Sequence, residues 1–426
     1  MSDKSPIWHP FTQHAIAPES IHVDRASGAY LFARNEGHKG ERRIIDAISS
    51  WWVITHGHCH PDITHAVQEQ AAKLDQVIFA GFTHDPAEEL AHSLIDITGD
   101  ALEHVFYSDS GSTAVEVALK MAIGYWEHTN RPRKKIIALE NAYHGDTFGT
   151  MSAGARSVYN KVYEPYLFEV EHIPVPTHGN EAKSFEALEN ILKTNKDDVA
   201  AFIFEPLIQG AGGMVMYSID ALKAMADLCK SYGVLLIADE VMTGFGRTGS
   251  LFACDQADLV PDIMCTSKGL TGGFLPMGAT LCTKDIYNAF YHKDKAKMFF
   301  HSSSFTGNPL ACAAANASLK IWKEQNVHGR ITTIAQTHAD AAHNFAQRDD
   351  LENIRQKGTI LAMDVKVNND AGYLSDIQPK LYKSFLSQNI LLRPLGNTIY
   401  IMPPYCVGDD DLADIYRAIE TALDEL

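Results

Sequence analysis

The chain has little positive charge for its size. Its 426 residues include 36 lysines and arginines against 53 aspartates and glutamates, a formal net charge of −17 at pH 7. Nucleic acids and anionic membranes recruit proteins through basic faces, so neither is expected as a main partner. A local basic pocket for a small anion stays compatible with this charge balance.

Long apolar runs and paired cysteines are also missing. No apolar stretch approaches the roughly 18 residues that a membrane-spanning helix needs. The N-terminal MSDKSPIWHPF lacks the apolar core of a signal peptide, so no signal peptide is expected. The seven cysteines are scattered and form no C-x-x-C pair. This usage is typical of reduced thiols and predicts a cytoplasmic protein.

A cluster of possible metal ligands occurs once, in THGHCHPD. It contains His56, His58, Cys59 and His60. Pro61 favours a helix start directly after the cluster, and no spaced second pair of ligands follows. No metal site is therefore expected.

The middle of the chain alternates short apolar runs with helical periodicity. Strands are predicted within 104–111, 135–145, 199–206, 234–240, 262–268 and 278–283. The clearest helices lie within 112–126 and 218–233, where apolar residues recur at helical spacing. Several strands are almost wholly apolar, as strands buried on both faces are. The alternation predicts an α/β fold with a largely parallel sheet and helices on both sides.

The two ends of the chain have a different pattern. Asp85 and Pro86 favour a helix start, and an alanine-rich helix is predicted after Pro309. The tail LLRPLGNTIYIMPP predicts two strands around a Gly396-Asn397 turn, followed by a last helix that begins near DDD. We therefore expect a large domain over 61–309. A smaller α+β domain is expected from both termini, residues 1–60 and 310–426.

One lysine is isolated among apolar residues and glycines. Lys268 is the only charged residue between Ile263 and Thr283, and it follows a predicted strand. In open α/β sheets ligands bind at the carboxyl ends of strands. A desolvated lysine has a lowered pKa and attacks carbonyl groups as a free amine. Taken alone, a lysine here more often reaches solvent past the strand end.

Other polar residues follow predicted strands in the same way. The DSGS segment joins a strand to a helix, so the amides near Gly111 and Ser112 could bind phosphate; an ordinary serine cap is the alternative. Asp239 ends an apolar strand, where a carboxylate needs a partner such as a protonated ring nitrogen. Capping of a loop would also explain it. Tyr143 follows a third strand.

Together these residues suggest pyridoxal phosphate. This cofactor needs a lysine for a Schiff base, an acid at its pyridine nitrogen, a phosphate cup and an aromatic face. Lys268, Asp239, Gly111 with Ser112, and Tyr143 would supply them in that order. Lys268 would then be isolated because its working form must be neutral.

The sequence at this point resembles class III aminotransferases of fold type I over nearly its whole length. The similarity is carried by the segments DAISSWW, HGHCHP, VFYSDSGSTAVEVALKMA, NAYHGDTFGTMS, EPLIQGAGGM, LLIADEVMTGFGRTGSLFACD, SKGLTGGFLPM and FTGNPLACAAANASL. The segments IWHPFTQ and SSWW and the tail RPLGNTIYIMPPY are similar to the branch of biotin synthesis. That branch implies S-adenosylmethionine as amino donor and 8-amino-7-oxononanoate as acceptor.

The resemblance implies a homodimer with active sites at the subunit interface, and it implies a role for each matching residue. Lys268 would bind the cofactor and shuttle a proton, Asp239 would pair with the pyridine nitrogen, and Tyr143 would stack on the ring. Gly111 and Ser112 would hold the phosphate, and Ser304 would reach it from the other subunit. The implied substrate-binding residues are Phe11, Trp51, Trp52, Asp146, Arg247 and Arg393. Arg393 would pair with the distal carboxylate of the ketone.

Each pocket assignment has a structural alternative. Adjacent tryptophans such as Trp51 and Trp52 are more often core residues than a substrate wall. Arg393 precedes Pro394 in a strand-like run and could be a solvated edge residue.

The sequence departs from the family pattern at two places. Phe11 stands where tyrosine is usual, which removes a hydroxyl and leaves lysine open as the amino donor. The family's HGPTF is HSSSF here, so Ser303 replaces a proline and Ser304 replaces a threonine. Two further alternatives stay open: another class III aminotransferase, acting on ornithine, 4-aminobutyrate or a lysine-like amine, and a non-catalytic cofactor-binding protein.

Overall fold

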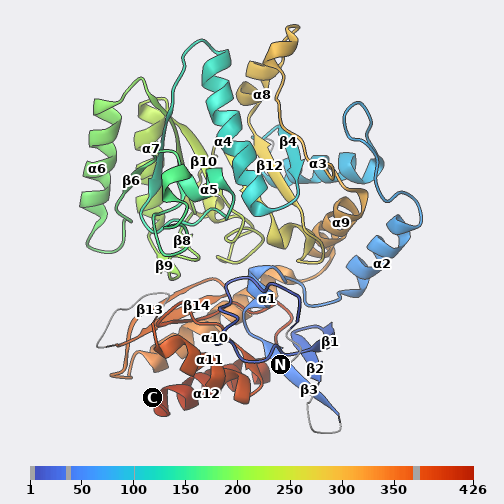
Figure 1. Cartoon of the computed structure of the whole chain (residues 1–426), viewed down its shortest axis with the longest axis vertical. Helices are drawn as coiled ribbons and strands as arrows, with labels where there is room; N and C mark the ends of the chain where they lie inside the picture. The colour runs from blue at the N-terminus through green and yellow to red at the C-terminus, as the bar shows by residue number, and fades with distance from the viewer. Residues whose placement is uncertain (1–4, 35–39, 100, 368–374) are drawn as a thin grey trace.

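A seven-stranded sheet organises the upper half of the molecule in the computed structural model (Figure 1), which describes residues 5–34, 40–99, 101–367 and 375–426. Along the sheet the strands are β4 (His104–Ser108), β12 (Gly278–Cys282), β11 (Ile263–Thr266), β10 (Leu235–Asp239), β7 (Val199–Phe204), β5 (Lys135–Leu139) and β6 (Glu171–Ile173). The strands from β11 to β6 pair in parallel, whereas β12 is antiparallel to both of its neighbours. The predicted α/β fold with a mostly parallel sheet is confirmed.

Helices cover both faces of this sheet because its strands are apolar on both faces. On β7, Ala201 and Ile203 pack in a core with α4 (Gly111–His128). The alternate residues Phe202 and Phe204 pack in another core with α6 (Glu181–Thr194) and α7 (Ile219–Ser231). The surrounding helices are α2 (Pro61–Ala71), α3 (Asp85–Ile97), α5 (Phe148–Ala153), α8 (Lys284–Phe290) and α9 (Pro309–Glu324).

The lower half of the molecule combines both ends of the chain (Figure 1). One sheet has the order β1 (Val23–Ser27), β2 (Tyr30–Arg34), β3 (Glu41–Asp46) and β15 (Ile390–Leu391). A second sheet contains β13 (Leu351–Lys357), β14 (Ile360–Val365) and β16 (Thr398–Ile401). Three helices pack here, namely α10 (Val327–Phe345), α11 (Ile377–Ser387) and α12 (Asp409–Asp424). The domain boundaries near residues 60 and 309 stay a prediction.

The tail has the two predicted strands on either side of the predicted turn, but they do not form a hairpin. A tight turn at Gly396-Asn397 is present, with Leu395 and Thr398 bridged across it. The flanking strands nevertheless do not pair with each other, because β15 joins β3 and β16 joins β14. Pro394 lies between β15 and the turn, and its missing N–H prevents a continuous ladder.

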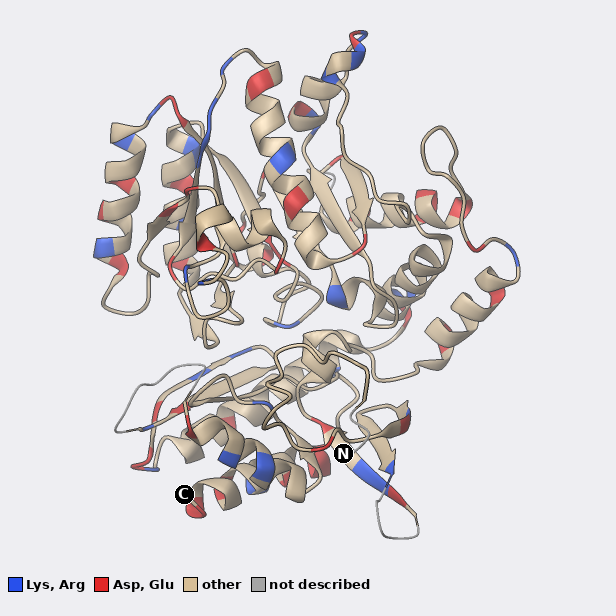
Figure 2. Ribbon diagram, in the orientation of Figure 1, with Lys and Arg blue, Asp and Glu red and all other residues tan. Residues whose placement is uncertain are grey.

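Acidic and basic side chains are interspersed over both halves (Figure 2). No helix within the described residues combines the length and the apolar character needed to cross a membrane.

Candidate active site

Four neighbouring parallel strands bring polar residues to one edge of the large sheet. Lys268 follows β11, Asp239 ends β10, Glu205 follows β7, and Tyr143 lies beyond the end of β5. These strands are adjacent in the order β11, β10, β7 and β5. Their carboxyl ends therefore meet, which is where ligands bind in sheets of this kind.

Lys268 is held in an unusual conformation above this edge. Its φ is 44°, in the left-handed region that a residue with a side chain rarely adopts. Its Nζ lies 5.0 Å from the centroid of the Trp52 ring. Burial lowers the pKa of Lys268, although the charges of Asp239 and Glu205 act to raise it. The net lowering makes the neutral, nucleophilic amine more accessible.

Glu205 ties together two of the loops beside Lys268. Its oxygens accept hydrogen bonds from the backbone N–H groups of Tyr143, at 3.1 Å, and Gly210, at 2.9 Å. Burial raises the pKa of Glu205 to about 7. The carboxyl group thus fixes the backbone that presents the Tyr143 ring.

Asp239 is paired with a buried histidine. Its Oδ2 lies 2.7 Å from His144 Nδ1, and its Oδ1 accepts a hydrogen bond from the Val241 amide at 3.1 Å. A carboxylate only accepts hydrogen bonds, so His144 Nδ1 carries the proton of this contact. His144 Nε2 is buried without a hydrogen-bond partner among the described residues. The pair orients the Asp239 carboxylate at the strand end.

The start of α4 forms a narrow cup. Ser110 caps the helix by accepting from the Thr113 amide, and the first intrahelical bond runs from Ala114 to Ser110. The amides of Gly111 and Ser112 precede that bond, so they are available for an anion. A Cβ on Gly111 would come within 2.6 Å of Val241, and one on Gly145 within 2.0 Å of Ser112 Oγ. Only glycine leaves this space open.

A cavity of about 210 Å³ lies against Lys268. Its aromatic wall consists of Phe11, Trp51, Trp52, Tyr143, Tyr159 and Tyr400. Lys268 and Arg393 are its charged lining residues. The cavity therefore presents aromatic faces and two basic groups, a combination that suits a carboxylate substrate with an apolar body.

The tryptophan wall is built on a left-handed turn. In α1 (Ser49–Trp52) the φ angles are 53°, 45°, 71° and 73° in chain order. Left-handed helix costs roughly 1–2 kcal/mol per residue, so the surrounding contacts must hold it. Ser49 Oγ donates to the Met402 carbonyl at 2.7 Å, and Trp52 Nε1 donates to the Tyr400 hydroxyl at 3.0 Å.

Phe11 and Arg393 meet at the mouth of the cavity. The Phe11 ring lies 5.5 Å from the Trp51 ring, measured between centroids. Arg393 Cζ lies 5.3 Å from the Trp51 centroid, and Arg393 Nη2 donates to the Phe11 carbonyl at 3.4 Å. No described carboxylate forms a salt bridge with Arg393. Its guanidinium is thus available to an anionic ligand.

Three predicted site residues lie elsewhere. Asp146 lines an adjoining cavity of about 440 Å³, and its backbone N–H donates to Ser112 Oγ at 3.3 Å. Ser304 is exposed, and its carbonyl accepts from Gln76 Nε2 at 2.9 Å. Arg247, expected to line the donor pocket, is 1% exposed and outside the cavity lining.

The contacts of Arg247 explain its position. Nη1 donates to the Pro403 carbonyl at 2.9 Å, while Nη2 donates to the carbonyls of Trp52 and Ile54 at 3.2 and 2.8 Å. The guanidinium binds backbone that supports the tryptophan wall. This geometry does not support direct binding of the amino donor.

The sequence already marked His144 and Glu205 as functional-looking residues at strand ends, without a specific role, but it did not indicate Tyr159 or Tyr400. His144 and Glu205 follow strands, so their positions were a usable signal. Tyr400 lies in β16 and Tyr159 in a loop, and both reach the cavity through tertiary packing alone.

The histidine cluster has other partners in the structure. His56 Nε2 lies 3.1 Å from Ser318 Oγ, and His58 Nε2 lies 2.7 Å from Asp46 Oδ2. Within the described residues, no group of three histidine, cysteine or acidic side chains could hold a metal ion.

Comparison with known proteins connects this geometry to a family. The family model described as aminotransferase class-III matches residues 12–423. The adenosylmethionine-8-amino-7-oxononanoate aminotransferase of Synechococcus elongatus is 46% identical, over 99% of both chains. The protein of the same name from Helicobacter pylori is 37% identical, over 99% of this chain and 96% of its own.

Solved structures agree with the sequence relatives. The adenosylmethionine-8-amino-7-oxononanoate aminotransferase of Methanocaldococcus jannaschii superposes with a TM-score of 0.92 at 32% identity, covering 99% of this chain and 97% of its own. A PLP-bound amine transaminase from an uncultivated Pseudomonas species gives 0.92 at 28% identity, covering 99% of each chain.

Proposed function

Because the chain belongs to the class-III aminotransferase family, we propose that it transfers the amino group of S-adenosylmethionine to 8-amino-7-oxononanoate. The product is 7,8-diaminononanoate, an intermediate of biotin synthesis. The observation that carries the proposal is the 46% identity over 99% of both chains with a relative named for this reaction. The position of Lys268 beside an aromatic cavity, in which Arg393 has no carboxylate partner among the described residues, supports it.

Pyridoxal 5'-phosphate is the proposed cofactor, and the site fits it. Lys268 offers an amine of lowered pKa, Asp239 offers an oriented carboxylate, and the open space at Gly111 and Gly145 leaves amides free for a phosphate. Tyr143 supplies an aromatic face. When bound, this cofactor supplies an aldehyde that condenses with primary amines and a ring that withdraws electrons from their Cα.

Lys268 is proposed to anchor the cofactor and then to move a proton. Its Nζ would move the proton from Cα of the amino donor to the aldehyde carbon of the cofactor, and would move a proton in the opposite direction when the ketone accepts the amino group. Burial favours the neutral amine that this transfer requires. Asp239, held by His144, would keep the ring nitrogen protonated.

Arg393 and the aromatic wall are proposed to select the ketone. Arg393 lines the cavity without a carboxylate partner among the described residues, so it can pair with the distal carboxylate of 8-amino-7-oxononanoate. Trp51, Trp52 and Phe11 would cover the hydrocarbon chain and exclude water. Asp146 is proposed to line the path of the donor.

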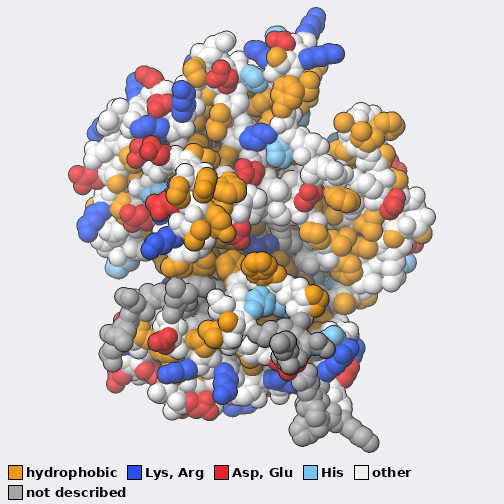
Figure 3. All heavy atoms as spheres, viewed as in Figure 1, with side chains coloured by type: hydrophobic (Ala, Val, Ile, Leu, Met, Phe, Trp, Pro, Cys, Tyr) orange, Lys and Arg blue, Asp and Glu red, His pale blue; other side chains and the backbone are white. Residues whose placement is uncertain are grey.

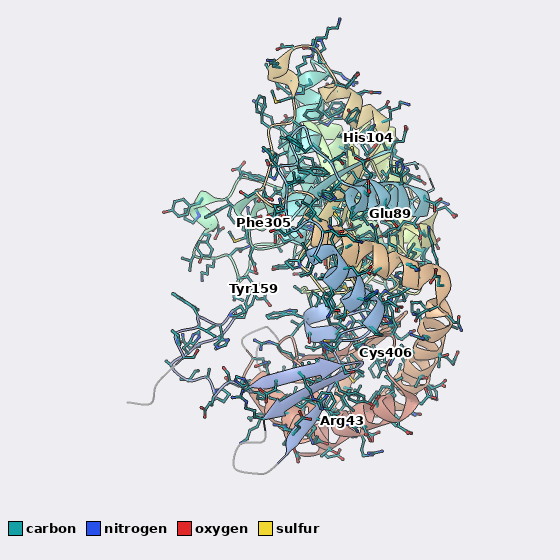
Figure 4. All side chains as sticks on the ribbon, turned by 90° about the vertical axis from the view of Figure 1, so that its right-hand side faces the viewer. Arg43, Glu89, His104, Tyr159, Phe305 and Cys406 are labelled. Carbon is teal, nitrogen blue, oxygen red and sulfur yellow. The ribbon has the colours of Figure 1, made fainter. Side chains whose placement is uncertain are left out.

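The protein is proposed to act as a cytoplasmic homodimer. Several apolar side chains outside the cavity are exposed, including Val162 at 81%, Tyr166 at 77% and Phe305 at 61%. Figure 3 shows apolar side chains gathered along the boundary between the two halves, and Figure 4 shows Tyr159 and Phe305 on one side of the molecule. A second copy could cover such surface and receive Ser304 at its phosphate cup. All seven cysteines are free, as expected in a reducing compartment.

The decisive experiment follows the cofactor absorbance in single half-reactions. We expect the purified holoenzyme to lose its aldehyde-form absorbance with S-adenosylmethionine and to recover it with 8-amino-7-oxononanoate. Recovery with other ketones but not with this one would contradict the proposal.

Lysine is the second candidate donor, and Phe11 is the residue that favours it. The cavity argues for S-adenosylmethionine. Its charged lining residues are the cations Lys268 and Arg393, and none of its lining residues is a carboxylate that could pair with the second ammonium group of lysine. A sulfonium needs no hydrogen-bond acceptor and can lie against aromatic faces. A response to lysine alone in the same experiment would reverse this choice.

A further inference from the structure

The left-handed turn that carries Trp51 is attached to one buried carboxylate. Asp46 ends β3 and is fully buried. Its Oδ1 accepts from the Ser50 amide at 2.9 Å and, more weakly, from the Ile48 amide at 3.4 Å. Its Oδ2 accepts from the Ser50 hydroxyl at 2.7 Å. Asp46 therefore satisfies donors that this turn leaves without regular partners.

His58 holds the same carboxylate from the other side. Its Nε2 lies 2.7 Å from Asp46 Oδ2, and since a carboxylate only accepts, Nε2 is the donor. The backbone of His58 is fixed in turn by two hydrogen bonds with Gly28, at 2.8 and 3.1 Å. The imidazole thus links the turn to the connection between β1 and β2.

The Trp51 side chain has little else to hold it. It is 37% exposed, and its ring contacts are with Phe11 and Arg393, which line the same cavity. Trp52, by contrast, is 5% exposed and hydrogen-bonded to Tyr400. The direction of the Trp51 ring consequently depends on the backbone of the turn.

We propose that Asp46 and His58 are positioning residues for the substrate wall. They keep Ser49–Trp52 in its left-handed conformation and so hold Trp51 against the cavity. The proposal deepens the proposed function and rests on it, because Trp51 is taken to contact the substrate. It also gives a task to His58 in the HGHCHP segment.

The test is a double-mutant cycle between His58 and Trp51. We expect His58→Ala to raise KM for the ketone about tenfold with kcat within about twofold, because the wall is displaced and Lys268 is not. His58→Gln keeps an N–H donor, so its KM for the ketone should lie close to that of the unchanged protein. In a Trp51→Ala background, His58→Ala should change KM less than about twofold. A full tenfold effect in that background would overturn the proposal.

A second readout does not depend on the substrate. Hydrogen exchange of the 48–54 amides in the holoenzyme should become faster in His58→Ala, while the affinity for pyridoxal phosphate stays unchanged. Unchanged exchange in 48–54 would overturn the proposal. If the half-reactions failed while this exchange rose, the proposed substrates would be wrong and the positioning role would stand.

Matched variants separate positioning from general destabilisation. His338 is fully buried, while the His58 side chain is 10% exposed, and His338 Nδ1 lies 2.7 Å from the Tyr416 hydroxyl, between α10 and α12. We expect His338→Ala to lower the melting temperature without changing KM or the 48–54 exchange. If His58→Ala fails to fold, Ser50→Ala removes one donor to Asp46 Oδ2 and should raise exchange in the same peptide; no rise would contradict the proposal.

Discussion

The two sides of the active site are built in different ways. On the strand-end side, Lys268, Asp239 and the α4 cup follow strands β11, β10 and β4 of one mostly parallel sheet. On the opposite side, Trp51 and Arg393 come from the two ends of the chain, and Trp51 belongs to a left-handed turn. The strand ends of one sheet thus position the reacting groups, and segments from the two ends of the chain position the substrate. Changes on the first side should affect the chemistry and the cofactor, and changes on the second should affect KM.

The largest effect is expected at Lys268. Lys268→Ala should lower turnover by at least about a thousandfold, because no other described amine lines the cavity, while the cofactor stays bound without a covalent link. Steady-state rates and the absorbance of the bound cofactor would measure this. Lys284→Ala, at an exposed residue that pairs with Glu103, is the matched control. Borohydride labelling of another side chain would contradict the assignment.

Gly145 tests the cup on the same side. At a φ of 133°, an alanine Cβ would come within 2.0 Å of Ser112 Oγ. We expect Gly145→Ala to weaken the binding of pyridoxal phosphate about a hundredfold, since both the backbone and the cup must move. Titration of the apoenzyme with pyridoxal phosphate would measure this affinity. The affinity for pyridoxal, which has no phosphate group, should fall much less. An equal fall in affinity would show that the phosphate binds elsewhere.

Arg393 tests the substrate side. Arg393→Ala should raise KM for 8-amino-7-oxononanoate about tenfold or more, the usual size of a lost charged hydrogen bond. KM for the amino donor should change far less. Arg417→Ala, at an exposed arginine paired with Asp414, provides the control. Equal increases in KM for both substrates would show that Arg393 does not bind the carboxylate of the ketone.

The smallest effect concerns Glu205 and pH. Burial raises its pKa from 4.5 to about 7, so its protonated form is favoured in the folded chain. Its contribution to stability is complete below about pH 4.5 and is lost as the pH rises through 7. Glu205→Gln should reduce the difference in the free energy of unfolding between pH 5 and pH 8 by on the order of 1 kcal/mol, measured by urea unfolding. An unchanged difference between the two pH values would show that another group causes the pH dependence of stability.

The strand-end side was largely predictable from the sequence because its signals are local. The α4 start is marked by a serine cap after a short apolar strand, and Lys268 is marked by the absence of neighbouring charge. The family prediction, based on such motifs, is confirmed. The roles of the individual residues stay predictions.

The substrate side was not predictable in the same way. The sequence near Ser49 does not indicate four consecutive positive φ angles, and one of the contacts of this turn is with Met402, which is 353 residues away. For the same reason Arg247 was placed in the donor pocket, although its partners are backbone carbonyls of Trp52, Ile54 and Pro403. Contacts between distant segments leave no periodic pattern in a single sequence.

The long-range hydrogen bond from Ser49 to Met402 has a consequence for biosynthesis. Residues 49–52 leave the ribosome early, but the carbonyl that anchors them emerges near the end of translation. The turn therefore lacks this contact until after the large sheet has been synthesised. Nascent chains stalled before residue 400 should hold an assembled sheet and an unformed tryptophan wall.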